Sequence, residues 1–166
     1  MGDQESETRR DEQLFATLYP GLRRFAAFVA PVALDPDDLV QEAAARALRH
    51  GPLSRLEAPD KYLRTAIVHL SANERRRLWR GARASERLVA PETAGEGDDY
   101  PSDLVIIDSL APLDRAVLFV TVIEGRSRAA AAELLGMTEP ALRQRLSRAL
   151  KSLRRSMEQE DASWKS

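Results

Sequence analysis

The sequence predicts an all-α protein, with two small helical domains joined by a flexible acidic linker. Apolar residues recur at helical spacing in several stretches, and no period-two alternation is long enough for a sheet. Aromatic residues are only 5% of the chain, which disfavours a β-sandwich or barrel. Positions 91–110 hold six acidic residues, no basic residue, and several Pro and Gly. The predicted domains are 12–90 and 110–158, and the linker is 91–109. The alternative for the acidic segment is a long surface loop within one domain.

Three helices are expected in the first domain. An apolar stripe that runs from Leu14 to Val29 marks the first helix. Asp35 is a suitable N-cap for the second helix, and Pro36 suits its first position. The third helix is expected to begin near Pro59 and to continue into an arginine-rich end.

The second domain has the pattern of a helix-turn-helix. An apolar helix over 113–123 precedes an alanine-rich helix over 128–135, and a Gly-containing turn follows. Thr138 can cap the last helix, which is expected to run from Glu139 to about Met157. Over 139–155 this helix has six basic residues and one acidic residue, which indicates a nucleic-acid-binding surface.

In a helix-turn-helix, the start of the second helix contacts base edges in the major groove. Glu139 could accept a hydrogen bond from a cytosine amino group, and Arg143 or Gln144 could pair with purine edges. Basic residues further along are better placed for phosphates. A solvated basic face on a structural helix is the alternative. The candidate DNA-binding residues here are Thr138, Glu139, Arg143, Gln144, Arg145, Arg148 and Lys151.

A second candidate DNA-binding cluster lies at the end of the third helix. It comprises Arg75, Arg76, Arg77, Trp79 and Arg80. Consecutive arginines cannot all face one side of a helix, so this segment must be well exposed. Arginines with an aromatic ring suit an unwound strand, because charge follows the backbone and rings stack on bases. The alternative is a charged helix end with Trp79 folded onto the core.

No motif of an enzyme, a metal site or a cofactor site is found. There is no cysteine, no phosphate-binding loop and no dinucleotide fingerprint. His50 is expected to cap a helix end, and His69 to be structural or to face a nucleic-acid backbone. The carboxylates after Asp35 are explained by helix capping and the helix dipole rather than by a metal. A protein-docking face is the more attractive interpretation of this acidic helix.

The motifs together resemble those of a known family. The segment 35–48, DPDDLVQEAAARAL, is similar to a D-L-V-Q-E-x-x-x-R-A signature. The segment 62–67, YLRTAI, followed by ERRR at 74–77, is similar to a W-L-x-x-I-A…D-x-x-R-R-R segment. The residues LAPLDR at 110–115, AELLG at 132–136 and LRQRLSRA at 142–149 look like the helix-turn-helix of the same family. The chain thus resembles the extracytoplasmic-function group of bacterial RNA polymerase sigma factors.

The resemblance implies a non-enzymatic transcription factor of two domains, region two and region four. The core polymerase-binding residues would be Asp38, Leu39, Gln41, Glu42 and Arg46, which would dock on the coiled-coil clamp of the β′ subunit. The third helix would melt the minus-ten promoter element, and the helix-turn-helix would read the minus-thirty-five element. Implied partners are the polymerase core, through its β′ clamp and β flap, promoter DNA and an anti-sigma factor. We expect a cytoplasmic protein with no membrane insertion.

Two other functions fit the same sequence. A stand-alone helix-turn-helix regulator would need a dimer face and would retard specific DNA without polymerase. A sigma mimic that sequesters an anti-sigma factor would support no transcription with core enzyme.

Overall fold

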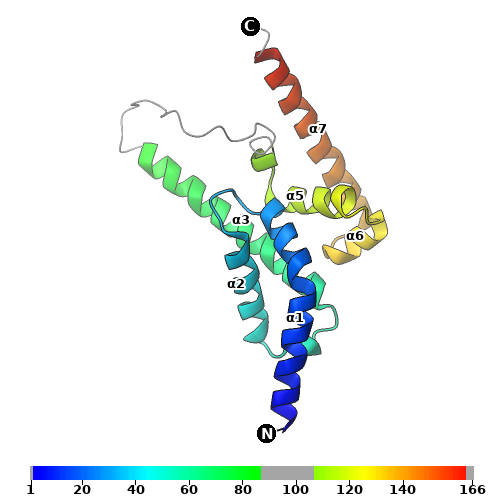
Figure 1. Ribbon diagram of the computed structural model, residues 1–166. Helices are drawn as coiled ribbons and strands as arrows, with labels where there is room; N and C mark the ends of the chain where they lie inside the picture. Colours follow the sequence, from blue (N-terminus) through cyan, green and yellow to red (C-terminus); the bar gives the residue numbers. More distant parts are fainter. Residues whose placement is uncertain (1, 87–106, 164–166) are drawn as a thin grey trace.

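The computed structural model describes residues 2–86 and 107–163, and all regular elements in these two stretches are helical. The first domain contains α1 (Gly2–Val29), α2 (Pro36–Leu48), the 3₁₀ turn η1 (Leu53–Arg55) and α3 (Pro59–Glu86). The second contains α5 (Pro112–Leu118), the π-helical turn η2 (Phe119–Ile123), α6 (Arg128–Leu134) and α7 (Glu139–Ser163). The three helices of the first domain pack against one another, and the two termini lie at opposite ends of the molecule (Figure 1).

Helix α2 begins as its sequence predicts. The Asp35 side chain accepts a hydrogen bond from the Asp37 amide at 2.8 Å, and Pro36 occupies the first turn. The apolar side of α2, which includes Val40 and Ala43, is buried against α1 and α3. The predicted start of α3 at Pro59 is also confirmed.

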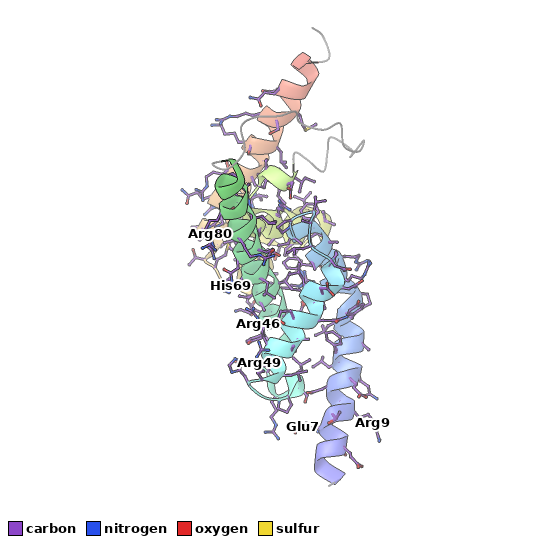
Figure 2. The ribbon with its side chains drawn as sticks, turned by 90° about the vertical axis from the view of Figure 1, so that its left-hand side faces the viewer. Glu7, Arg9, Arg46, Arg49, His69 and Arg80 are labelled. Carbon is purple, nitrogen blue, oxygen red and sulfur yellow. The ribbon has the colours of Figure 1, made fainter. Side chains whose placement is uncertain are left out.

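Helix α1 starts much earlier than the apolar stripe indicates. The stripe begins at Leu14, whereas α1 begins at Gly2. Two polar contacts to the η1 segment hold this amino-terminal part. Asp11 accepts hydrogen bonds from two amides of η1, and Glu7 forms an ion pair with Arg55 at 2.5 Å. Glu7 lies near the amino-terminal end of the molecule (Figure 2). Periodicity missed this part because its contacts are polar and long-range.

Further polar contacts join α1 to the start of α2. The Tyr19 hydroxyl donates a hydrogen bond to Asp37 Oδ1, and Arg23 Nε donates to the same oxygen at 2.8 Å. The Tyr19 hydrogen bond lowers the pKa of Asp37 below its ordinary value, with Arg23 acting in the same direction.

Tyr19→Phe is expected to lower stability at neutral pH and to matter less in acid. A carboxyl whose folded-state pKa is lowered stabilises the fold above its ordinary pKa of about 3.9, and this contribution is lost as the pH falls through the folded value. Urea unfolding at a series of pH values from neutral to acid measures the effect. In an Asp37→Asn background the same substitution should show no pH-dependent loss, and an equal loss at all pH values would contradict the assignment.

The second domain has the turns that its sequence predicts. Gly125 lies just after η2 and Gly136 just after α6, both with φ of +65°, a conformation that glycine adopts without steric cost. The Thr138 hydroxyl accepts a hydrogen bond from the Ala141 amide at 3.3 Å, which confirms the predicted cap. Helix α7 runs to Ser163 and is thus longer than expected.

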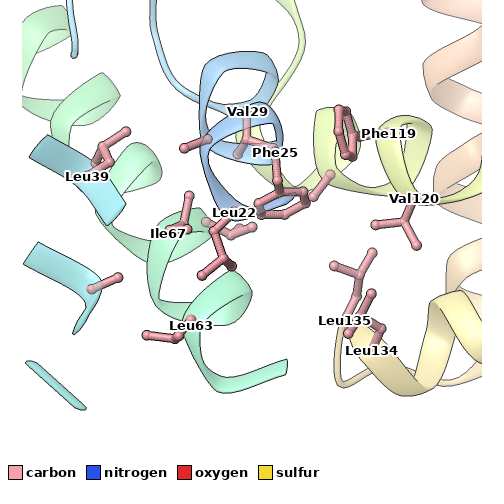
Figure 3. Close-up of a cluster of buried hydrophobic side chains, with 14 of the residues drawn as sticks. Leu22, Phe25, Val29, Leu39, Leu63, Ile67, Phe119, Val120, Leu134 and Leu135 are labelled. Carbon is pink, nitrogen blue, oxygen red and sulfur yellow. The ribbon is translucent and has the colours of Figure 1, made fainter. Parts of the chain in front are cut away.

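The second domain packs directly on the first. One cluster of buried apolar side chains extends from α1, α2 and α3 into α5, η2 and α6 (Figure 3). The Phe119 ring lies 5.6 Å from that of Phe25 and 5.5 Å from that of Phe28, centroid to centroid. The sequence predicted two domains with a linker, but it did not predict this contact. Residues 107–109, at the end of the expected linker, form a helical turn; 91–106 lie outside the described residues.

Buried arginines add specific contacts between the domains. Arg115 is 2% exposed and donates to the carbonyl oxygens of Ala30 at 2.7 Å, Asp108 at 2.7 Å and Leu110 at 3.1 Å. It also donates to the Asp108 carboxylate at 2.6 Å. Burial lowers the pKa of Arg115, although arginine stays charged at neutral pH.

Arg64 makes a similar contact from α3. It is 3% exposed, lies over the Phe25 ring, and donates to Asp60 and to Glu124 of the second domain, both at 2.8 Å. Arg64 and Arg115 therefore bind the two domains through hydrogen bonds that tolerate little change in their relative position.

Among the described residues, no helix has the length and apolar character needed to cross a membrane.

Candidate polymerase and nucleic-acid interfaces

The polar face of α2 is accessible in this arrangement. Asp38 and Gln41 are exposed, and Glu42 and Arg46 are half-buried. Arg46 Nε lies 2.7 Å from Glu42 Oε1, one helical turn away. The hydrogen bond from Arg46 lowers the pKa of Glu42, so this carboxylate is charged at neutral pH.

Leu39 differs from the other predicted docking residues. It is only 7% exposed and belongs to the buried core. Its side chain therefore holds α2 against the rest of the domain and is not part of the accessible face. The face consists of polar side chains on a helix whose other side is fixed by packing.

The arginine cluster of α3 is largely exposed. Arg76 donates to Asn73 at 2.5 Å and Arg77 to Glu74 at 2.9 Å, both within the same helix. Arg80 is exposed and donates to a backbone carbonyl of its own helix. These contacts are at the surface, so they leave the guanidinium groups accessible to an anionic partner.

Arg75 and Trp79 have a different environment. Arg75 donates to the carbonyl oxygens of Leu110 at 2.8 Å and Ser109 at 2.9 Å, just before α5. The guanidinium carbon of Arg75 also lies 5.6 Å from the centre of the Trp79 ring. Trp79 is 59% exposed, so it is not folded onto the core. Arg75 is thus the member of the cluster that the second domain engages.

A surface pocket of about 820 Å³ lies beside the first half of α3. Its lining includes Tyr62, Thr65 and His69 of α3 and the segment 56–58 that precedes this helix. Side chains of opposite charge complete the lining; they are Arg46, Glu57, Lys61 and Glu133. Flat rings and cations around a hollow suit an unpaired base and its phosphate.

Basic side chains continue from this pocket along the same side of the molecule. Figure 2 shows Arg80 and His69 on α3, Arg46 on α2 and Arg49 just after α2 along one side. His69 is exposed, so of the two expectations for it the accessible position beside a nucleic-acid backbone stays open. His50 is exposed just after the end of α2, and its backbone amide donates a hydrogen bond to the Ala47 carbonyl oxygen.

Most predicted base- and phosphate-contacting side chains of α7 are exposed. Thr138, at the start of this helix, is exposed and its hydroxyl caps the helix. Further exposed members of the set are Glu139, Arg143, Gln144, Arg148 and Lys151. They occupy consecutive turns of one helix, as a helix that reads a groove requires.

Arg145 is the exception in α7. It is half-buried, and its guanidinium donates to Asp114 of α5 at 2.8 Å. This ion pair ties the last helix to the first helix of the second domain. Arg145 thus orients α7, and its neighbours Arg143 and Gln144 face solvent.

Three residues that matter to this arrangement were not singled out from the sequence: Asp11, Arg64 and Arg115. Only Arg64 had a visible local signal, because Asp60 precedes it by one helical turn. The partners of Asp11 lie 42 and 43 residues away, and Arg115 binds a carbonyl 85 residues away. Contacts between residues so far apart in the chain leave no periodic pattern in the sequence.

In the described part of the chain, no group of three or more His, Cys, Asp or Glu side chains is arranged to hold a metal ion.

Two family models match the sequence. The model of Sigma-70 region 2 matches residues 14–81, and a model of Sigma-70 region 4 matches residues 104–153. Together they cover more than half of the chain. The first match includes the polar face of α2 and the arginine cluster of α3, and the second includes the helix-turn-helix.

Similar proteins carry names from the same family. The chain is 27% identical to an RNA polymerase sigma-E factor of Streptomyces antibioticus, with 95% of this chain and 89% of the relative covered. It is also 27% identical to an RNA polymerase sigma-E factor of Streptomyces avermitilis, with 90% and 86% covered.

A solved structure shares the fold. It is that of the sigma factor RpoE in complex with the anti-sigma factor NepR from Bartonella quintana, with a TM-score of 0.61 and 21% identity. The match covers 89% of this chain and 96% of that one. The expected two-domain helical architecture is therefore confirmed. The chain belongs to the sigma-70 family, in its extracytoplasmic-function group, and is a sigma factor, which brings core RNA polymerase to promoter DNA.

Proposed function

We propose that this sigma factor uses three surfaces for its partners: the polar face of α2 for the polymerase, α3 with its pocket for the unwound minus-ten element, and α7 for the minus-thirty-five duplex. The first two surfaces meet at Arg46, which lines the pocket. The observation that carries the proposal is the accessibility of α2. Its polar face stays exposed while the second domain packs on α1 and α3. The polymerase can therefore be engaged first, before the domains separate.

The α3 surface suits single-stranded DNA for two physical reasons. The exposed arginines attract the backbone, and the exposed Trp79 ring offers a stacking surface. The pocket beside Tyr62 and His69 is large enough for a base and has cations at its edge. We assign this pocket to an unpaired base of the unwound minus-ten element.

The α7 surface suits duplex DNA. Exposed Arg143 and Gln144 near its start have the donor and acceptor groups that read purine edges. Arg148 and Lys151 follow on later turns and are assigned to phosphates. The affinity of α7 alone for DNA is low, and the polymerase raises its effective concentration at the promoter by holding both domains.

We also infer regulation by an anti-sigma factor in the cytoplasm. The support is the solved relative, which is bound to one. In this chain, the second domain already covers Arg64 and engages Arg75 of the first. A protein that binds both domains in this arrangement would keep these side chains from DNA.

A double substitution, Asp38→Ala with Glu42→Ala, tests the docking surface. We expect binding to core polymerase to weaken about tenfold, because two charged contacts on an exposed face are lost. Pull-down with core enzyme measures it, and circular dichroism checks that the fold is kept. Glu12→Ala on α1 is a matched control of an exposed carboxylate. Unchanged polymerase binding by the double variant would show that another face docks.

A further inference from the structure

Asp11 joins two segments of the first domain that are far apart in the chain. Its Oδ2 accepts a hydrogen bond from the Leu53 amide at 2.9 Å, and its Oδ1 accepts one from the Ser54 amide at 2.8 Å. These amides begin η1, whose own N-cap residue, Pro52, provides no side-chain cap. Asp11 of α1 therefore caps η1 from another helix.

The charge of Asp11 fits this role. Burial raises the pKa of Asp11. The hydrogen bonds from Ser54 and Leu53, together with the charge of Arg55, lower it by more, so the pKa lies below its ordinary value. An ionised carboxylate accepts two amide hydrogen bonds at once, one at each oxygen. Glu7, one turn earlier, pairs with Arg55 at 2.5 Å and holds the same segment.

The segment that Asp11 holds leads directly into the pocket wall. Leu53 is 1% exposed and anchors η1 in the core. The next residues, 56–58, line the pocket together with Tyr62 and His69 of α3. Because residues 56–58 follow η1 directly in the chain, the position of η1 affects where this part of the lining lies. Both anchors of η1 to α1 lie before residue 14, where the match to the region-two family model begins.

We propose that Asp11 is a positioning residue for promoter reading: by capping η1 it fixes the 56–58 wall of the pocket and thereby the preference of the sigma factor at the minus-ten element. This rests on the proposed function, in which the pocket receives an unpaired base. Discrimination between bases depends on small displacements of the groups around them, so a mobile wall accepts more sequences.

The hydrogen bonds of Asp11 are near the surface, and this separates positioning from folding. One bond is part-buried and the other exposed, so water can replace the carboxylate when it is removed. Asp11→Asn keeps the shape and one acceptor oxygen, whereas Asp11→Ala removes both acceptors. The Asn variant keeps the test valid should the Ala variant be poorly folded. Glu12→Ala, an exposed neighbour on the same helix, is the matched control.

The experiment is in vitro transcription by the reconstituted holoenzyme on two promoter pools, one randomised in the minus-ten element and one in the minus-thirty-five element. We expect Asp11→Ala to reduce the preference among minus-ten sequences about fivefold, with Asp11→Asn intermediate, because each misread base pair changes binding by a comparable factor. The ranking of minus-thirty-five sequences and the pull-down of core polymerase should match those of the Glu12→Ala control.

Two results would overturn the proposal. If transcription falls equally on all minus-ten sequences, Asp11 only stabilises the fold. If the ranking of minus-ten sequences is unchanged in both Asp11→Ala and Asp11→Asn, η1 does not shape recognition. The variants Tyr62→Ala and His69→Ala distinguish a failure of the Asp11 proposal from a failure of the proposed function of the pocket. If neither of them changes the minus-ten ranking, the pocket itself is wrongly assigned.

Discussion

Arg115→Ala is expected to lower the free energy of unfolding by about 3 kcal/mol. The wild-type guanidinium donates to three backbone carbonyls and one carboxylate, and it is 2% exposed. Alanine leaves these acceptors without their donor and opens a hole where the domains meet. Hydrogen bonds from a charged donor contribute more than neutral ones, so the loss exceeds that of an ordinary surface contact.

Urea unfolding followed by circular dichroism measures this loss. Arg115→Lys is the informative comparison, because lysine keeps the charge but lacks the planar fork that reaches several acceptors. We expect it to restore less than half of the lost stability. If the second domain separates first, the transition of Arg115→Ala splits in two. A free energy of unfolding within about 0.5 kcal/mol of the wild type, the usual effect of a surface change, would contradict the role given to Arg115.

Arg143→Ala is expected to reduce initiation at preferred promoters by about 2 kcal/mol, or roughly thirtyfold. Arg143 is exposed near the start of α7, and no ion pair or hydrogen bond of its side chain is found in the described residues. A guanidinium that pairs with a guanine edge discriminates between bases, so the loss should be large at some minus-thirty-five sequences and small at others.

Two neighbours on α7 serve as controls for Arg143. Arg148→Ala should weaken binding to all promoter sequences alike. It should also reduce the slope of log affinity against log salt concentration by about one, as expected of a phosphate contact. Arg145→Ala should instead lower stability, because Arg145 pairs with Asp114. Transcription by holoenzyme over a range of salt concentrations distinguishes Arg143→Ala from Arg148→Ala, and urea unfolding measures the loss of stability in Arg145→Ala. Equal losses at every sequence for Arg143→Ala would show that it, too, contacts a phosphate.

Local patterns predicted the elements of this fold well. The cap at Asp35, the start of α3 at Pro59 and the Thr138 cap of α7 are all set by side chains within a few residues of the helix end. Such contacts can be read from the sequence because their spacing is fixed by helix geometry. The 3₁₀ turn η1 was missed, since three residues are too few to show a period.

Contacts between distant segments could not be predicted in this way. An apolar stripe shows that Phe25 is buried, but not that Phe119 is its partner. The same holds for Arg115, whose sequence neighbourhood gives no hint of a buried cation, and for Asp11, which belongs to a polar segment without periodicity. The candidate binding residues were found because charge and exposure are local properties. The assignment of each to base, phosphate or polymerase stays a prediction.

Glu133 of α6 completes the lining of the pocket beside α3. Glu133 adds a negative charge to a lining that also holds Arg46 and Lys61, so its carboxylate repels an anionic nucleotide in this pocket. The packed state thus opposes its own occupation by DNA, although the pocket is already formed. Under the proposed function, this sets an order in time: α6 withdraws with its carboxylate, and strand capture follows.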